Sequence, residues 1–292
     1  MASVDQELRS INIQSVQILE KEQDPRDFNW QTGGYLGFEV YEGSKAWYGR
    51  LPLEEHRQDW PNDGLQKNLS RFDELIKLLH PIPKNEIYPE FPPRGLTRYR
   101  PQQEGDNATR FFKAPKLGYH RAGRDNLAMR LLNEAEIHEK ILHHPHRNLG
   151  SYLGCVEEEG RLVRLVFGKY SKSLEDCLQF GLPWEFTLQQ CEDFMDGIEE
   201  AVAHMHSLGL AHNDISPSNI MFDDMGRAVL IDFDACAPLE SCLTKGGLVG
   251  GWKGPVVGQG LQFEVSSAEC DKLAIKEIRK DLAEALEKRD GM

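Results

Sequence analysis

The stretch "HNDISPSNIMF" at residues 212–222 is followed by "IDFD" at residues 231–234. Asn219 stands five residues after Asp214, and Asp232 stands eighteen residues after it. An amphipathic pattern of helical period ends just before the first stretch, and an apolar run ends directly before Asp232. The sequence therefore predicts a loop and a strand end that bring two carboxylates and one amide together.

These three side chains fit one kind of chemistry. Asp214 is a candidate to orient a hydroxyl group or to take its proton. Asn219 and Asp232 offer oxygen ligands, which Mg²⁺ prefers when it also binds substrate phosphates. Phosphoryl transfer needs mainly positioning and charge neutralisation, so a base, two metal ligands and one cation on the phosphates would suffice.

Composition excludes several other classes of protein. The chain has 292 residues and a formal net charge of −13, which argues against non-specific nucleic-acid binding. No apolar run approaches the roughly 20 residues of a membrane helix, and the start "MASVDQELRS" does not resemble a secretory signal. The six cysteines form no CxxC pair, which favours reduced thiols. We expect an intracellular protein, cytoplasmic or nuclear, with no nucleic-acid or membrane partner.

The organisation of the chain changes near residue 90. The segment 1–90 contains an expected hairpin at 35–51 with "EGS" as its turn, and an expected helix at 68–79. Residues 80–95, "HPIPKNEIYPEFPPRG", hold five prolines and predict an extended connector. No group of residues in 1–90 points to chemistry.

After the connector, mostly strands come first and mostly helices follow, which indicates an α+β fold with two lobes. The expected strands are 109–115, 149–157, 161–169 and a hairpin within 219–233; the expected helices are 126–144, a short one starting within 171–178, 187–209 and 266–288.

The joint pattern of "HNDISPSN", "IDFD" and the preceding "MHSLGLAHND" resembles the catalytic loop and metal-binding motif of the protein-kinase-like superfamily. The residues of this pattern are most similar to those of protein-kinase-like proteins of filamentous fungi. The resemblance covers about residues 96–288. It implies a small, mostly β N-lobe at 91–170 and a helical C-lobe at 171–292, truncated after the helix carrying Asp271, with 1–90 as an extension. It also implies ATP and Mg²⁺ as cofactors.

The resemblance assigns roles to individual residues. Asp214 would act on the acceptor hydroxyl, and Asn219 and Asp232 would hold the metal ions. Lys113 in "FFKAP" would bind the nucleotide phosphates, with Glu134 as its helix partner.

Two of these assignments have a rival nearby, and three further residues receive a role. Glu136 is the rival of Glu134, and Lys116 lies close to Lys113. Gly95 is the one glycine of 91–101 that could approach the nucleotide. By the same resemblance, Asp271 would brace the catalytic loop from the C-lobe, and Phe233 would pack like the phenylalanine of the DFG motif.

The sequence also departs from the family pattern. Asn213 replaces the usual arginine, which makes activation by phosphorylation less expected. Asp234 replaces glycine, and Ser216 stands where serine/threonine kinases usually carry a phosphate-binding lysine. No GxGxxG pattern precedes Lys113, so we expect weak nucleotide affinity. Val256 follows Pro255 where the family has glutamate.

Three functions fit these observations. The first is a divergent protein serine/threonine kinase. The second is a phosphotransferase for small molecules, because "HND" also resembles choline- and aminoglycoside-kinase loops. The third is a pseudokinase that serves as a binding module. Retention of Asp214, Asn219 and Asp232 favours an enzyme, with a protein or small-molecule hydroxyl as acceptor; the sequence leaves the oligomeric state open.

Overall fold

The computed structural model describes residues 15–22, 35–42, 44–52, 77–92, 94–101, 109–115, 117, 127–182, 186–252 and 260–290. The chain forms two compact units. The first comprises Met1–Phe91, Ala114–Leu131 and Glu157–Val163, and the second comprises Pro92–Lys113, Leu132–Val156 and Arg164–Met292. The lobe boundaries expected from the sequence stay predictions.

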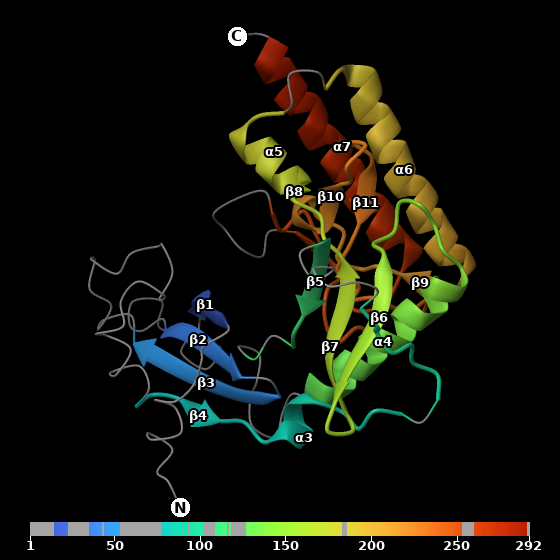
Figure 1. The fold of residues 1–292 in the computed structure, drawn as a ribbon. Helices are drawn as coiled ribbons and strands as arrows, with labels where there is room; N and C mark the ends of the chain where they lie inside the picture. Colours follow the sequence, from blue (N-terminus) through green and yellow to red (C-terminus); the bar gives the residue numbers. More distant parts are fainter. Residues whose placement is uncertain are drawn as a thin grey trace, which may run out of the picture. The chain divides into compact units, whose positions relative to one another are not determined.

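The first unit contains a four-stranded antiparallel sheet in the order β1-β2-β3-β4 (Figure 1). Its strands are β1 (Ser15–Glu22), β2 (Tyr35–Glu42), β3 (Lys45–Pro52) and β4 (His80–Pro81). The hairpin expected at 35–51 is confirmed, because Tyr35 pairs with Pro52 and Glu42 with Lys45. The helix expected at 68–79 lies outside the described residues, apart from a turn at 77–78.

The proline-rich connector contains more structure than its composition predicts. Besides β4, it forms α3 (Lys84–Ile87), a single turn that begins after Pro83. Ile87 and Tyr88 are fully buried, and Arg161 donates a 2.8 Å hydrogen bond to the carbonyl of Tyr88. Burial of two large apolar side chains outweighs the local preference for an extended chain.

A second sheet, most of which belongs to the second unit, has the order β5-β7-β6. Its strands are β5 (Arg110–Lys113), β7 (Arg161–Gly168) and β6 (Tyr152–Glu158), and α4 (Leu127–His143) accompanies it. β5 pairs antiparallel with β7, so that Lys113 lies opposite Leu165. These elements confirm the expected strands and helix. His138 of α4 stacks on Tyr152 of β6 with 5.0 Å between ring centroids, which fixes the helix against the sheet.

Among the described residues, the second unit also contains α5 (Leu174–Phe180), α6 (Leu188–Ser207) and α7 (Ala268–Asp290). Capping boxes begin α5 at Ser173 and α6 at Thr187, and Gly209 follows α6 with φ +73°. α6 and α7 lie side by side (Figure 1) and share a continuous apolar core. In the described part of the chain, no helix is long and apolar enough to cross a bilayer.

Short strands and a 3₁₀ turn lie before and between these helices. They are β8 (Lys172–Ser173), β9 (Leu210–Ala211), η5 (Pro217–Asn219), β10 (Ile220–Phe222), β11 (Ala228–Leu230), β12 (Ala237–Pro238), β13 (Leu248–Val249) and β14 (Leu261–Gln262). The expected hairpin within 219–233 is confirmed, because Ile220 pairs with Leu230. β9 pairs with β12, so the chain before residue 212 lies beside the chain after residue 236.

A buried contact between α6 and the loop before β6 yields a prediction about stability. A Cβ added at Gly197 would lie 2.6 Å from Nδ2 of Asn148, whose amide donates a 2.7 Å hydrogen bond to the carbonyl of Ala228. Gly197→Ala should therefore destabilise the protein by about 1–3 kcal/mol through overpacking, although alanine favours helices. Urea denaturation measures the change.

The partner residue supplies the control for this experiment. In an Asn148→Ala background the obstructing amide is gone, so Gly197→Ala should cost nothing or stabilise. A double-mutant cycle without coupling between the two positions would contradict the packing argument.

Candidate active site

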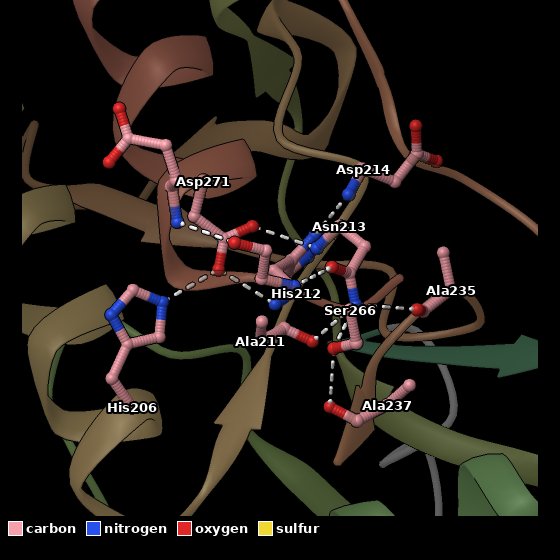
Figure 2. Close-up of polar contacts among 11 residues, drawn as sticks. His206, Ala211, His212, Asn213, Asp214, Ala235, Ala237, Ser266 and Asp271 are labelled. Carbon is pink, nitrogen blue, oxygen red and sulfur yellow. Dashed lines mark hydrogen bonds and ion pairs between the residues drawn. The ribbon is translucent and has the colours of Figure 1, made fainter. Parts of the chain in front are cut away.

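The carboxylate of Asp271 anchors the loop that begins at residue 212. Asp271 lies in the first turn of α7 and is fully buried. Its oxygens accept hydrogen bonds from the backbone nitrogens of His212 (2.9 Å) and Asn213 (2.8 Å), and its Oδ2 lies 2.9 Å from Nε2 of His206 (Figure 2). Backbone groups held by a buried carboxylate cannot shift without leaving that charge unpaired, so the loop is rigid at this point.

Asn213 connects this loop to two later segments through its side chain. It is 1% exposed and adopts φ +61°, a left-handed conformation that asparagine tolerates. Its amide nitrogen lies within hydrogen-bond distance of the carbonyls of Ala211 (3.0 Å) and Ala235 (3.3 Å) and of the Ser266 hydroxyl (3.0 Å) (Figure 2). The N–H of Ser267 donates a 3.2 Å hydrogen bond to Oδ1 of Asn213. Asn213 thus holds the following segment by neutral hydrogen bonds instead of the usual arginine.

His212 joins the two halves of the motif. Its Nε2 lies 3.0 Å from the carbonyl of Ile231, and Asp214 N–H lies 3.3 Å from its Nδ1. Both contacts are satisfied when Nε2 carries the proton. The ring therefore fixes the backbone of Asp214 relative to the residue that precedes Asp232.

Lys113 brings the sheet and the motif together. Its ammonium lies 2.6 Å from Oε1 of Glu134 and also binds Oδ1 of Asp232. Burial by itself lowers the pKa of Lys113. The negative charges of Glu134 and Asp232 outweigh burial and hold that pKa well above its ordinary value. Burial raises the pKa of Glu134, but the charge of Lys113 and the contact with His138 together outweigh burial and lower that pKa, so the Lys113–Glu134 pair is charged.

A row of aromatic side chains packs next to this ion pair. His138, one helical turn after Glu134, is 1% exposed, and its ring meets that of Phe233 at 4.8 Å between centroids. Phe233 in turn meets His212 at 5.1 Å. Burial lowers the pKa of His138 and outweighs the opposing effect of Glu134. The Nε2 of His138 lies 3.7 Å from Oε1 of Glu134, and neither ring nitrogen has a partner at hydrogen-bond distance among the described residues. A neutral His138 therefore packs as an aromatic ring that couples α4 to Phe233.

Asp214 and Asn219 face each other across the loop. The amide nitrogen of Asn219 donates a 2.8 Å hydrogen bond to the carbonyl of Asp214 and lies 3.5 Å from its Oδ2. Since the nitrogen is used in this way, the amide oxygen is the atom available for a cation. Burial is the main cause that raises the pKa of Asp214, and the nearby charge of Asp234 adds to it.

Asp234 and Lys245 add a second ion pair to the site. The Lys245 ammonium binds Oδ2 of Asp234, and both side chains are largely buried, at 28% and 19% exposure. Sequence reasoning noted Asp234 as a departure but did not single out Lys245. The two adjacent glycines after Lys245 were the available signal in the sequence, because such a pair permits a tight turn. Both glycines adopt positive φ in the structure.

The structure separates the rival residues of the sequence analysis. Glu136 is exposed on α4, and Lys113 pairs with Glu134. Lys116 lies outside the described residues. Gly95 is not brought to the residues around Lys113 and Asp214. Its segment joins β6 through the bond from Tyr99 N–H to the carbonyl of Cys155, at the sheet edge opposite β5, so its contact with a nucleotide stays a prediction.

The donor set fits Mg²⁺ bound together with a polyphosphate. No cluster of three His, Cys, Asp or Glu that could hold a metal by itself occurs among the described residues. Asp232 and Asn219 offer one carboxylate and one amide oxygen, and Mg²⁺ commonly uses one or two protein carboxylates plus substrate phosphates. The catalytic roles assigned to these residues stay predictions.

An ion pair between a strand lysine and a helix glutamate, together with a His-x-Asp loop held by a buried aspartate, is typical of two-lobed, kinase-like folds. The protein kinase domain family matches residues 106–251, half of the 292 residues. The chain belongs to this family.

Several individual proteins are similar to part of the chain, and they share one name. The chain is 32% identical over 91 residues to a dual serine/threonine and tyrosine protein kinase of Apis mellifera, and 33% identical over 88 residues to those of Gallus gallus and Homo sapiens. The matches cover 30–31% of this chain and 9% of each relative. The similarity is therefore to a small part of those proteins.

The buried amide of Asn213 leads to a second stability prediction. Asn213→Ala should lower the free energy of unfolding by about 2–4 kcal/mol, because it removes several buried hydrogen bonds and places alanine at φ +61°. Asn213→Gly should cost about 1 kcal/mol less, because glycine adopts this conformation without strain. Urea denaturation of both variants separates the amide from the backbone contribution. Wild-type stability in Asn213→Ala would contradict the role of the amide.

Proposed function

We propose that this chain is an ATP-dependent protein kinase that phosphorylates serine or threonine hydroxyls and requires Mg²⁺. The observation that carries the proposal is the charged contact of Lys113 with both Glu134 and Asp232, beside a loop that presents Asp214 and Asn219. Family membership supports the reaction class, and the names of the relatives support protein hydroxyls as acceptors.

Each residue has a distinct task in this reaction. Lys113 would hold nucleotide phosphates, and Glu134 would keep its ammonium oriented. Asp232 and Asn219 would hold Mg²⁺, which supplies neutralisation of the phosphate charge. Asp214 would align the acceptor hydroxyl and take its proton as the new oxygen–phosphorus bond forms.

A small-molecule acceptor is the second candidate. Ser216 and Asn213 support it, because the loop 212–219 has no lysine or arginine and also resembles choline- and aminoglycoside-kinase loops. Phosphate transfer from labelled ATP with Mg²⁺ to mixed proteins and, separately, to small alcohols and aminoglycosides distinguishes the candidates. Labelling of proteins alone would support the first proposal, and labelling of small acceptors alone would replace it.

ATP binding should depend on a divalent cation and on Asp232. The site gathers the carboxylates of Asp214, Asp232 and Asp234, which repel phosphates unless a cation bridges them. We expect calorimetry to show an at least tenfold weaker ATP affinity without Mg²⁺ or Mn²⁺, a difference that Asp232→Asn should abolish. Asp224→Asn, at an exposed position of the β10–β11 turn, is the matched control. Equal affinities with and without metal in the wild type would refute this prediction.

Asp214→Asn should reduce kcat by about 10²–10⁴ while leaving ATP affinity unchanged, because the acceptor and not the nucleotide meets this carboxylate. Asparagine keeps the size of the side chain but removes its basicity. Steady-state kinetics and calorimetry on the same preparation check the two parts. Thermal unfolding should be nearly unchanged, as it should be for Asp224→Asn.

The pH profile tests the same residue independently. A base acts only when it is deprotonated, and burial raises the pKa of Asp214. Activity should therefore fall, as the pH is lowered, through a pKa above that of an ordinary aspartate, and this limb should be absent in Asp214→Asn. Full activity of that variant would contradict the role of Asp214 as the base.

A further inference from the structure

The proposed reaction needs a cation that the catalytic loop does not contain. Residues 212–219 include no lysine or arginine, and Ser216 occupies the position where the family resemblance expects a lysine. Lys113 is already engaged by Glu134 and Asp232. The phosphate that moves between two oxygens carries several negative charges, and groups fixed in advance stabilise it most.

Lys245 has the charge and the setting for this task. Its ammonium is held by Oδ2 of Asp234, the carboxylate that replaces the family's glycine. The other oxygen of Asp234 is buried and has no hydrogen-bond partner among the described residues. The side chain of Lys245 is 28% exposed, so it lies partly open to solvent while Asp234 holds its ammonium.

The residues after Lys245 fix its backbone against the catalytic loop. Gly247 N–H donates a 2.6 Å hydrogen bond to the carbonyl of Asn213, the residue directly before Asp214. A Cβ added at Gly246 would lie 2.6 Å from the same carbonyl oxygen, so only glycine permits this approach. Gly246 and Gly247 adopt φ +77° and +79°. Lys245 is therefore attached to the backbone that presents Asp214.

An electrostatic effect agrees with this placement. The positive charge of Lys245 lowers the pKa of Asp214, which opposes the effect of burial. The charges of the two side chains are therefore close enough to interact.

Resting on the phosphoryl transfer proposed above, we propose that Lys245 contacts the terminal phosphate of the nucleotide and replaces the missing loop lysine, with Asp234 holding its ammonium in place. In the reaction, the acceptor oxygen forms a bond to the terminal phosphorus, and the bond from that phosphorus to the β,γ-bridging oxygen breaks. The bridging oxygen keeps the electron pair in the departing ADP. The hydroxyl proton passes to Asp214, and Lys245 takes no part in proton transfer.

Nucleotide binding provides a readout that does not require turnover. Calorimetry with Mg²⁺ compares ADP with a non-hydrolysable β,γ-imido analogue of ATP, on the full chain. Lys245→Met should weaken binding of the analogue by about 10- to 100-fold, the range for hydrogen bonds to charged groups, and leave ADP binding unchanged. Lys245→Arg should retain most of the wild-type preference for the analogue. Lys280→Met, at an exposed lysine of α7, should match the wild type for both nucleotides.

A purely structural role gives a different pattern. If Lys245 only pairs with Asp234, Lys245→Met should weaken both nucleotides equally or neither, and either result overturns the proposal. Should Lys245→Met fail to melt cooperatively, Lys245→Gln replaces it, because glutamine keeps a polar side chain but removes the charge. Loss of the preference for the analogue in Lys245→Gln supports the proposal, and a retained preference overturns it.

The proposal and the function on which it rests fail in distinguishable ways. Wild-type protein that neither binds Mg²⁺–nucleotide nor transfers phosphate overturns both. Wild-type protein that binds and transfers, with Lys245→Met equal to it in analogue preference and kcat, overturns only the assignment of Lys245.

Discussion

The arrangement of the site depends on the buried carboxylate of Asp271. A charge in an apolar interior must be compensated, and here the backbone nitrogens of His212 and Asn213 compensate it together with His206. The helix α7 thereby determines the path of a loop almost sixty residues earlier in the chain, since the two backbone bonds span 59 and 58 residues. Asp214 follows directly after this anchor, so its position is set by the core and not by the loop alone.

From that anchor, two kinds of contact extend to the rest of the site. Rings connect His212 to Phe233 and His138, and so reach α4. Neutral hydrogen bonds of Asn213 reach the segments around Ala235 and Ser266. The position that usually carries a phosphate-pairing arginine is thus occupied by a buried amide that is already fully engaged. The hydrogen bonds of this amide hold the later segment, and the Asp234–Lys245 pair adds a charged contact to it.

Local pattern was sufficient for most elements of the second unit. The helical period predicted α4, α6 and α7, and the cap residues Ser173 and Thr187 mark helix starts because their side chains satisfy backbone groups locally. The connector 80–95 was less predictable. Its prolines indicate an extended chain, but burial of Ile87 and Tyr88 in the first unit selects a turn of helix there. Such burial depends on partners distant in sequence, which no local pattern contains.

The sequence by itself determined the motif, its spacing, and hence the family resemblance that assigned Asp214, Asn219 and Asp232 to one site. It left Glu134 and Glu136 both open as partners of Lys113, because helical registers differing by two residues were both compatible with the pattern. The tertiary structure decided that choice, since only Glu134 faces Lys113 while Glu136 faces away into solvent. It also brought Lys245 beside Asp234, eleven residues earlier, and attached it to the loop of Asp214. Contacts of this kind follow from how glycines and buried charges let separate segments approach, which is a property of the folded chain.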